Sequence, residues 1–124
     1  MGVKETNGVM ITGIQHFAII SSSEKSVEFY TKLGFRETFR KERTNDAVVI
    51  LEGHGMYLEI FIDANHPARA TNPENMGLRH LALKVDDIEK IEREFDCGPI
   101  KTDWFGKKYR VATDPDGLPI EFLE

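Results

Sequence analysis

The sequence has one cysteine, one tryptophan and no long hydrophobic run. Because Cys97 is alone, no disulfide can form within the chain, and we expect the protein to reside in a reducing cytoplasm. No apolar stretch approaches the ~20 residues of a membrane-spanning helix, so no membrane partner is predicted. Basic residues are outnumbered, with 16 Lys and Arg against 21 Asp and Glu and a formal net charge of −5. This balance predicts that nucleic acid is not a partner.

What the sequence does contain is an internal repeat. Residues 13–19, GIQHFAI, recur as residues 77–83, GLRHLAL, so His16 and His80 hold the same place in two copies. Roughly forty residues after each histidine, an apolar strand pattern contains a glutamate, Glu59 in YLEIF and Glu121 in PIEFL. We therefore predict one domain over residues 1–124, made of two modules at about 10–64 and 78–124. A polar connector at 65–76 joins them.

Each module is predicted to run strand, helix, then three strands. The first helix is expected to begin at a capping pair, Ser21 with Glu24, and the second at Asp86 with Glu89. Apolar residues at helical spacing follow each cap. They are Val27, Tyr30 and Leu33 in the first helix, and Ile88, Ile91 and Phe95 in the second. The remaining strands are predicted at 36–43, 47–52, 56–62, 100–104, 109–113 and 118–123.

Side-chain alternation then predicts which strand residues share a face. In the first strand, His16 and Ala18 lie opposite the bulky apolar residues, and each glutamate likewise opposes its apolar neighbours. The apolar face should pack against the helices, while the other face collects His16, Glu59, His80 and Glu121. Two half-buried carboxylates on one face cost several kcal/mol unless a cation or protons lie between them. Any one of these residues alone would be interpreted as structural, but their shared repeat positions predict a metal site.

The two other histidines share neither the repeat position nor the apolar context. His54 lies between two glycines in an expected hairpin turn, and His66 precedes Pro67 in the connector. Both are interpreted as solvated turn residues.

Two further motifs carry a family resemblance. Residues 29–35, FYTKLGF, and 114–121, DPDGLPIE, together with the paired modules, resemble the vicinal oxygen chelate superfamily, which includes glyoxalase I, bleomycin resistance proteins and dioxygenases. The resemblance implies an α+β fold in which paired βαβββ modules form a curved mixed sheet around a divalent metal, with helices on the outer face. It implies His16, Glu59, His80 and Glu121 as ligands, for zinc, nickel, cobalt, manganese or iron. It also implies a homodimer, and leaves open whether the modules pair within one chain or across two.

The implied activity is that of a metal-dependent lyase or isomerase of glyoxalase type, acting on a small oxygenated molecule. Such an enzyme abstracts a proton and stabilises an enediolate on the metal, with Glu121 as the expected base and Glu59 as the second candidate. Glyoxalase I proteins place an arginine and an asparagine where this chain has Ile20 and Asp63, which argues against glutathione as the carrier thiol. Lys107 is the candidate to bind an anionic substrate group, with a solvated turn as the alternative.

Three other functions from the same superfamily remain open. An acyl-CoA epimerase would use similar carboxylates, and a ring-cleaving dioxygenase would bind Fe(II) through two histidines and one glutamate. A non-catalytic resistance protein would keep the fold and a small-molecule pocket without the ligand set.

Overall fold

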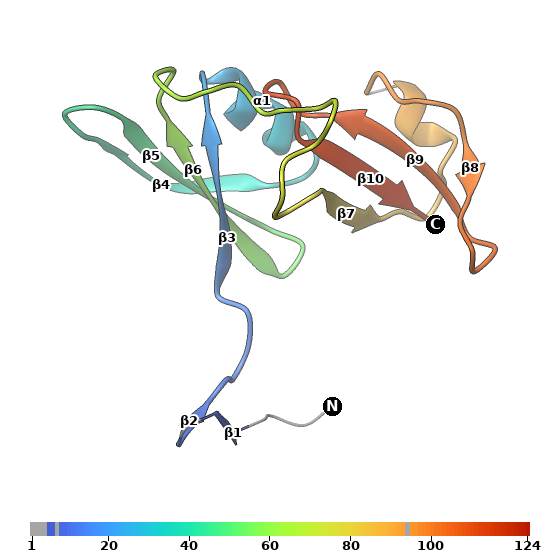
Figure 1. Ribbon diagram of the computed structural model, residues 1–124, viewed down its shortest axis with the longest axis horizontal. Coiled ribbons are helices and arrows are strands. Elements are labelled where there is room, and N and C mark those ends of the chain that lie inside the picture. Colours follow the sequence, from blue (N-terminus) through green and yellow to red (C-terminus); the bar gives the residue numbers. More distant parts are fainter. Residues whose placement is uncertain (1–4, 7, 94) are drawn as a thin grey trace.

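The structure is a computed structural model that describes residues 5–6, 8–93 and 95–124. Two four-stranded mixed sheets stand side by side, and a small N-terminal hairpin lies apart from both (Figure 1). None of the helices in these ranges is long and apolar enough to cross a bilayer. The first sheet follows the N-terminal hairpin, β1 (Glu5–Thr6) and β2 (Val9–Met10), and contains β3 (His16–Ser21), β4 (Arg36–Glu42), β5 (Ala47–Gly53) and β6 (Met56–Ile62). The second contains β7 (Leu81–Lys84), β8 (Lys101–Thr102), β9 (Lys108–Thr113) and β10 (Pro119–Leu123).

The predicted repeat is confirmed by strand order and register. The first sheet has the order β3-β6-β5-β4 and the second the order β7-β10-β9-β8. In each, the first strand of the module pairs in parallel with the last, and the other pairs are antiparallel. Ala18 lies opposite Glu59 in one sheet, and Ala82 lies opposite Glu121 in the other. The two modules therefore place their glutamates at the same point of the same ladder.

The first helix, α1 (Lys25–Lys32), buries the predicted stripe but starts differently from the prediction. Val27 and Tyr30 are buried, and Gly34 ends the helix with φ of 98°, a conformation that glycine adopts without a steric cost. The predicted capping pair is wrong, because Glu24 is the N-cap residue and makes no side-chain capping bond. The Ser21 hydroxyl instead lies within hydrogen-bond distance of the Ser23 carbonyl, at 2.9 Å, and of the Ser26 hydroxyl, at 2.6 Å.

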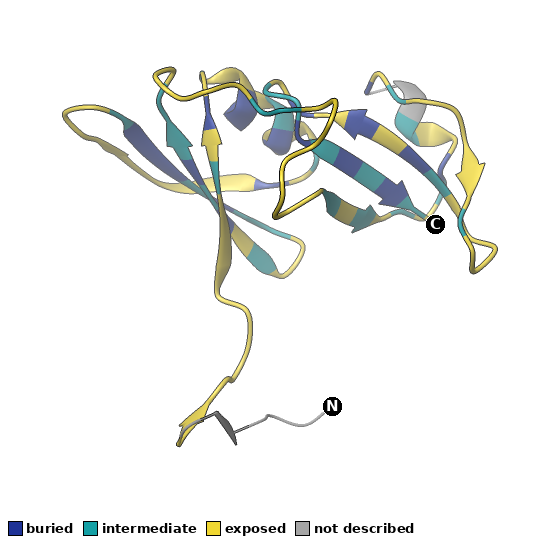
Figure 2. Ribbon diagram, viewed as in Figure 1, coloured by how far each residue is buried: buried dark blue, intermediate teal, exposed yellow. Residues whose placement is uncertain are grey.

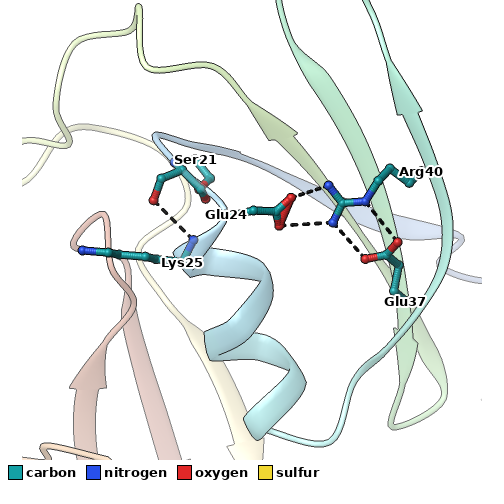
Figure 3. Close-up of polar contacts among 6 residues, drawn as sticks. Ser21, Glu24, Lys25, Glu37 and Arg40 are labelled. Carbon is teal, nitrogen blue, oxygen red and sulfur yellow. Dashed lines mark hydrogen bonds and ion pairs between the residues drawn. The ribbon is translucent and has the colours of Figure 1, made fainter.

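Glu24 is held from outside the helix. Figure 3 shows the Arg40 guanidinium of β4 between the carboxylates of Glu24 and Glu37. The Nη2 atom donates to Glu37 at 2.9 Å and to Glu24 at 3.1 Å. The hydrogen bonds with Glu37 and then Glu24 raise the pKa of Arg40. This exposed network fixes the start of α1 against the sheet.

The second predicted helix is shorter than expected. A 3₁₀ helix, η1 (Lys90–Arg93), takes its place, although Ile88 and Phe95 remain buried as predicted. The turn that precedes it is fixed by distant contacts, since the Ile88 amide donates to the Glu124 carboxylate at 3.1 Å. Asp87 rather than Asp86 accepts the amide of Glu89.

Among the strands, β8 differs most from its predicted bounds of 100–104, and the others agree within one residue at each end. Strand β8 ends at Thr102 because Asp103 starts a tight turn, in which its carboxylate accepts the amides of Phe105 and Lys107 at 2.9 Å each. The turn removes the backbone from the ladder before Trp104, where the predicted strand ended.

The buried side chains of both modules form one cluster at the junction of the sheets with α1 (Figure 2). The fully buried Tyr30 donates its hydroxyl to Asp114 at 2.7 Å, which joins α1 to the DPDG turn of the second module. Asp116 in the same turn accepts the Ser22 amide at 3.0 Å and the Ser26 hydroxyl at 3.2 Å. Partial burial alone would raise the pKa of Asp116, but the hydrogen bonds from Ser22, Ser21 and Ser26 together outweigh it and lower that pKa. The closing turn of one module is thus bonded to the helix of the other.

Candidate metal centre

The first module brings His16 and Glu59 together. His16 begins β3 and Glu59 lies in the adjacent strand β6, with His16 Nε2 and Glu59 Oε1 4.0 Å apart. The other ring nitrogen of His16, Nδ1, is hydrogen-bonded to the side-chain oxygen of Gln15. A small cavity of about 230 Å³ opens beside this pair and is lined by Gln15, His16, Thr38, Ile50, Tyr57 and Glu59.

The second module repeats the arrangement with His80 and Glu121. His80 directly precedes β7, Glu121 lies in the adjacent strand β10, and His80 Nε2 is 3.2 Å from Glu121 Oε2. The glutamate side chains are about equally accessible, at 24% for Glu59 and 20% for Glu121. The predicted alternation of faces is therefore confirmed at both pairs.

Each pair suits one side of a metal site. Ligands held about 2.0–2.2 Å from an ion, at angles of about 90–109°, lie roughly 3.0–3.5 Å from one another. The 3.2 Å separation in the second pair meets that spacing, and the 4.0 Å separation in the first needs only a small side-chain adjustment. An imidazole nitrogen and a carboxylate oxygen are also donors that the borderline divalent metals accept.

The structure does not bring the two pairs together within one chain. Among the described residues, no group of three or more His, Cys, Asp or Glu side chains is placed to hold a metal ion. The chain therefore presents two separate pairs of candidate ligands, which we call half-sites: half-site one is His16 with Glu59, and half-site two is His80 with Glu121.

The other two histidines make definite contacts. The solvated-turn interpretation of His54 is wrong in part, because its Nε2 lies 2.6 Å from the Leu33 carbonyl and its ring packs edge-on against Phe35. His66 is exposed, as predicted, but pairs with Asp63 at 3.4 Å. Neither histidine joins a half-site.

Lys107 lies in the exposed turn between β8 and β9. Its backbone amide donates to the Asp103 carboxylate, so Lys107 is part of a tight turn. A solvated turn was the alternative to a substrate-binding role for this residue. The neighbouring Trp104 and Phe105 are 92% and 78% exposed, so little of either side chain is covered by the described residues.

Sequence reasoning missed two residues beside the half-sites. Gln15 was read only as part of the repeat, although a polar residue next to a candidate ligand histidine is a signal for a supporting hydrogen bond. Arg69 was read only as part of a polar connector, yet its Nη2 donates at 3.0 Å to the carbonyls of Leu78 and Arg79, just before His80. Arg69 also lines a cavity of about 690 Å³ between the connector and β3.

Comparison with known proteins agrees with the fold. The sequence model of the Glyoxalase/Bleomycin resistance protein/Dioxygenase superfamily matches residues 13–122. The chain belongs to this superfamily. It is 39% identical to the uncharacterized protein YwkD of Bacillus subtilis (strain 168), over 94% of this chain and 99% of that one. It is equally similar, at 39% identity and a TM-score of 0.82, to the structure of a glyoxalase family protein from Enterococcus faecalis, with 91% and 98% of the two chains covered.

More distant structures share the fold alone. A lactoylglutathione lyase from Agrobacterium tumefaciens has 19% identity and a TM-score of 0.65, with 92% of this chain and 94% of that one covered. The fosfomycin resistance protein FosX from Listeria monocytogenes, solved as an E126Q mutant with Mn(II) and 1S,2S-dihydroxypropylphosphonic acid, has 14% identity and a TM-score of 0.71, with 92% and 93% covered. Proteins of this fold thus include a lyase and a resistance protein that was solved with a small molecule and a divalent metal.

Proposed function

We propose that this protein is a metal-dependent lyase or isomerase of glyoxalase type whose site is built from two chains. Half-site one of one chain would face half-site two of a second chain in a homodimer. The observation that carries the proposal is the separation of two register-matched half-sites within one chain. Each half-site is accessible and incomplete by itself, so a second copy supplies what the first lacks.

The donor set supports a divalent ion. Two neutral imidazoles and two carboxylates offset a charge of 2+ and leave coordination positions for substrate oxygens. Zinc, nickel, cobalt, manganese and ferrous iron all accept such mixed ligands. Among distant relatives of the same fold, FosX was solved with Mn(II).

The chemistry divides between the ion and the two glutamates. A divalent ion held there would polarise the substrate oxygens and stabilise the negative charge that develops on them. Glu121 would take the proton from the carbon next to the carbonyl and return it to the neighbouring carbon. Glu59 would hold its ligand position, and Lys107 of the exposed turn would attract an anionic part of the substrate. The single cysteine fits a reducing cytoplasm.

Mixed dimers test the two-chain site directly. One chain carries His16→Ala with Glu59→Ala, and the other carries His80→Ala with Glu121→Ala. Each variant alone has no complete ligand set, whether the modules pair within a chain or across two. Mixing them creates one site from two intact half-sites only if the ligands come from different chains. Random association makes about half of the dimers mixed, and each mixed dimer has one of the two sites. We therefore expect the mixture to recover about a quarter of the metal content of the native dimer, measured by elemental analysis after dialysis.

Solvent hydrogen exchange at the α carbon of hemithioacetals then tests the reaction on the same samples. We expect exchange to return together with metal in the mixed dimer. A native protein that takes up no metal under metal-replete conditions would contradict the proposal, and a mixture that stays metal-free would contradict the two-chain arrangement.

A further inference from the structure

The two ligand histidines differ in what contacts the ring nitrogen that faces away from the glutamate. Nδ1 of His16 is bonded to the side-chain oxygen of Gln15. The repeat places Arg79 at the equivalent position before His80, and its guanidinium instead donates to Glu74 at 3.0 Å. Within the described part of the chain, His80 contacts Glu121 and makes no hydrogen bond through Nδ1.

An amide oxygen can only accept a hydrogen bond, so its partner Nδ1 must carry the proton. In a neutral imidazole the lone pair then lies on Nε2, the atom that faces Glu59 Oε1 at 4.0 Å. A divalent ion binds the lone pair and not the N–H, so the Gln15 contact makes Nε2 the available ligand atom. It also restricts rotation of an imidazole whose side chain is 42% exposed.

We propose that Gln15 is a positioning residue that fixes the tautomer and the orientation of the His16 ring before any ligand arrives. This proposal rests on the metal site described under Proposed function. The Gln15 contact makes the two half-sites unequal. The ring of His16 is oriented before a metal binds, whereas the ring of His80 has no equivalent hydrogen bond on Nδ1 among the described residues. Arg79 cannot supply that support, since a guanidinium has no acceptor.

The first test is made on the metal-free protein by nitrogen-15 NMR of the histidine side chains, above the pH at which they titrate. In the native protein we expect the proton of His16 on Nδ1 and the lone pair on Nε2. Gln15→Leu, which keeps the bulk and removes the acceptor, should shift His16 toward the tautomer with the proton on Nε2. Gln15→Glu, which keeps an acceptor oxygen, should retain the native tautomer.

The second test is a titration of the same proteins with Mn²⁺ or Zn²⁺ alone, followed by calorimetry. Loss of such an outer hydrogen bond weakens metal binding by about 10–100-fold, which we expect for Gln15→Leu. Arg79→Leu is the matched control at the equivalent repeat position and should leave the His16 tautomer unchanged. Gln15 is exposed, so folding should survive, and thermal unfolding of each variant checks it.

The outcomes separate the two proposals. A native protein with the His16 proton on Nε2, or a Gln15→Leu variant with native tautomer and native affinity, would overturn the role of Gln15. A protein that shows the expected tautomer but takes up no metal would overturn the proposed function and leave the Gln15 contact standing.

Discussion

Glu59 and Glu121 occupy equivalent positions, with nearly the same exposure and each beside one histidine. Geometry alone therefore gives them equal access to a substrate. The assignment of Glu121 as the base comes from its place in the DPDGLPIE motif, and the two carboxylates can be separated by experiment.

Glu121→Gln should abolish turnover while metal binding is only weakened. The amide oxygen can still donate a lone pair to the ion, but it cannot take up the substrate proton. We expect a loss of about 10²–10⁴-fold in solvent exchange of the substrate α hydrogen. Glu59→Gln is the matched control, since it alters the equivalent ligand, and it should retain more activity. Full activity in Glu121→Gln would remove it as the base.

Single residues were predicted with uneven success. His16 and Glu59 were predicted to share a face, because alternation along a strand follows from backbone geometry and needs no knowledge of neighbours. His54 could not be placed in the same way. Its contact with the Leu33 carbonyl joins residues 21 positions apart, and it depends on the packing of the hairpin against the end of α1.

At the scale of elements, the connector between the modules is more ordered than its polar composition indicated. Arg69 crosses it to bind two carbonyls directly before β7, and Arg79 binds Glu74 within it. The Arg69 contacts fix the backbone that leads into His80. The Nε atom of Arg69 is buried and has no hydrogen-bond partner among the described protein groups.

Arg69→Gln should loosen the segment that positions His80. Two hydrogen bonds from a charged donor to backbone carbonyls are lost, each worth about 1.5–3 kcal/mol in favourable cases. We expect faster amide hydrogen exchange in the connector and at the start of β7, with a smaller change in β3. Arg79→Gln is the control, because that side chain is 75% exposed and its ion pair with Glu74 contributes about 0–1 kcal/mol. Equal exchange rates in the two variants would contradict the role of Arg69.

Strands were easier to predict than the second helix. The extents of β5 and β6 follow from their largely apolar sequences, and the structure places them within one residue of the prediction. The apolar stripe of the second module was predicted correctly, but spacing alone cannot distinguish a long α-helix from a short 3₁₀ turn. That distinction depends on contacts such as the one between Ile88 and Glu124 at the end of the chain.

At the scale of the whole molecule, the fold was predictable because the sequence contains the same structural unit twice. The proposed pairing of the half-sites was not, because it requires a second copy that no pattern within one chain encodes. Several large apolar side chains, among them Ile14, Met76 and Trp104, remain exposed on the single chain. Apolar side chains scattered singly over a surface are normal, so these residues by themselves do not argue for the proposed dimer.

Removing divalent metal should weaken the dimer. An ion bound by ligands from both chains stabilises the assembly as any ligand of the associated state does, by about 2.7 kcal/mol at a concentration 100-fold above its dissociation constant. We expect a chelator to raise the monomer–dimer dissociation constant, measured by sedimentation equilibrium, and added metal to restore it. A variant with His16→Ala and His80→Ala should show no response to either treatment. A native protein whose association ignores the chelator would contradict a shared ion.

The order of strands has a consequence for the proposed metal site. His16 begins β3, and His80 directly precedes β7. Both are edge strands with one hydrogen-bonded neighbour each. Strands β6 and β10, which carry the glutamates, are flanked on both sides. The carboxylates therefore lie on the more rigid internal strands, and the imidazoles lie on or next to the more flexible edge strands. When one bound ion is replaced by another of different radius, we expect the edge strands β3 and β7 to shift and the internal strands β6 and β10 to stay in place.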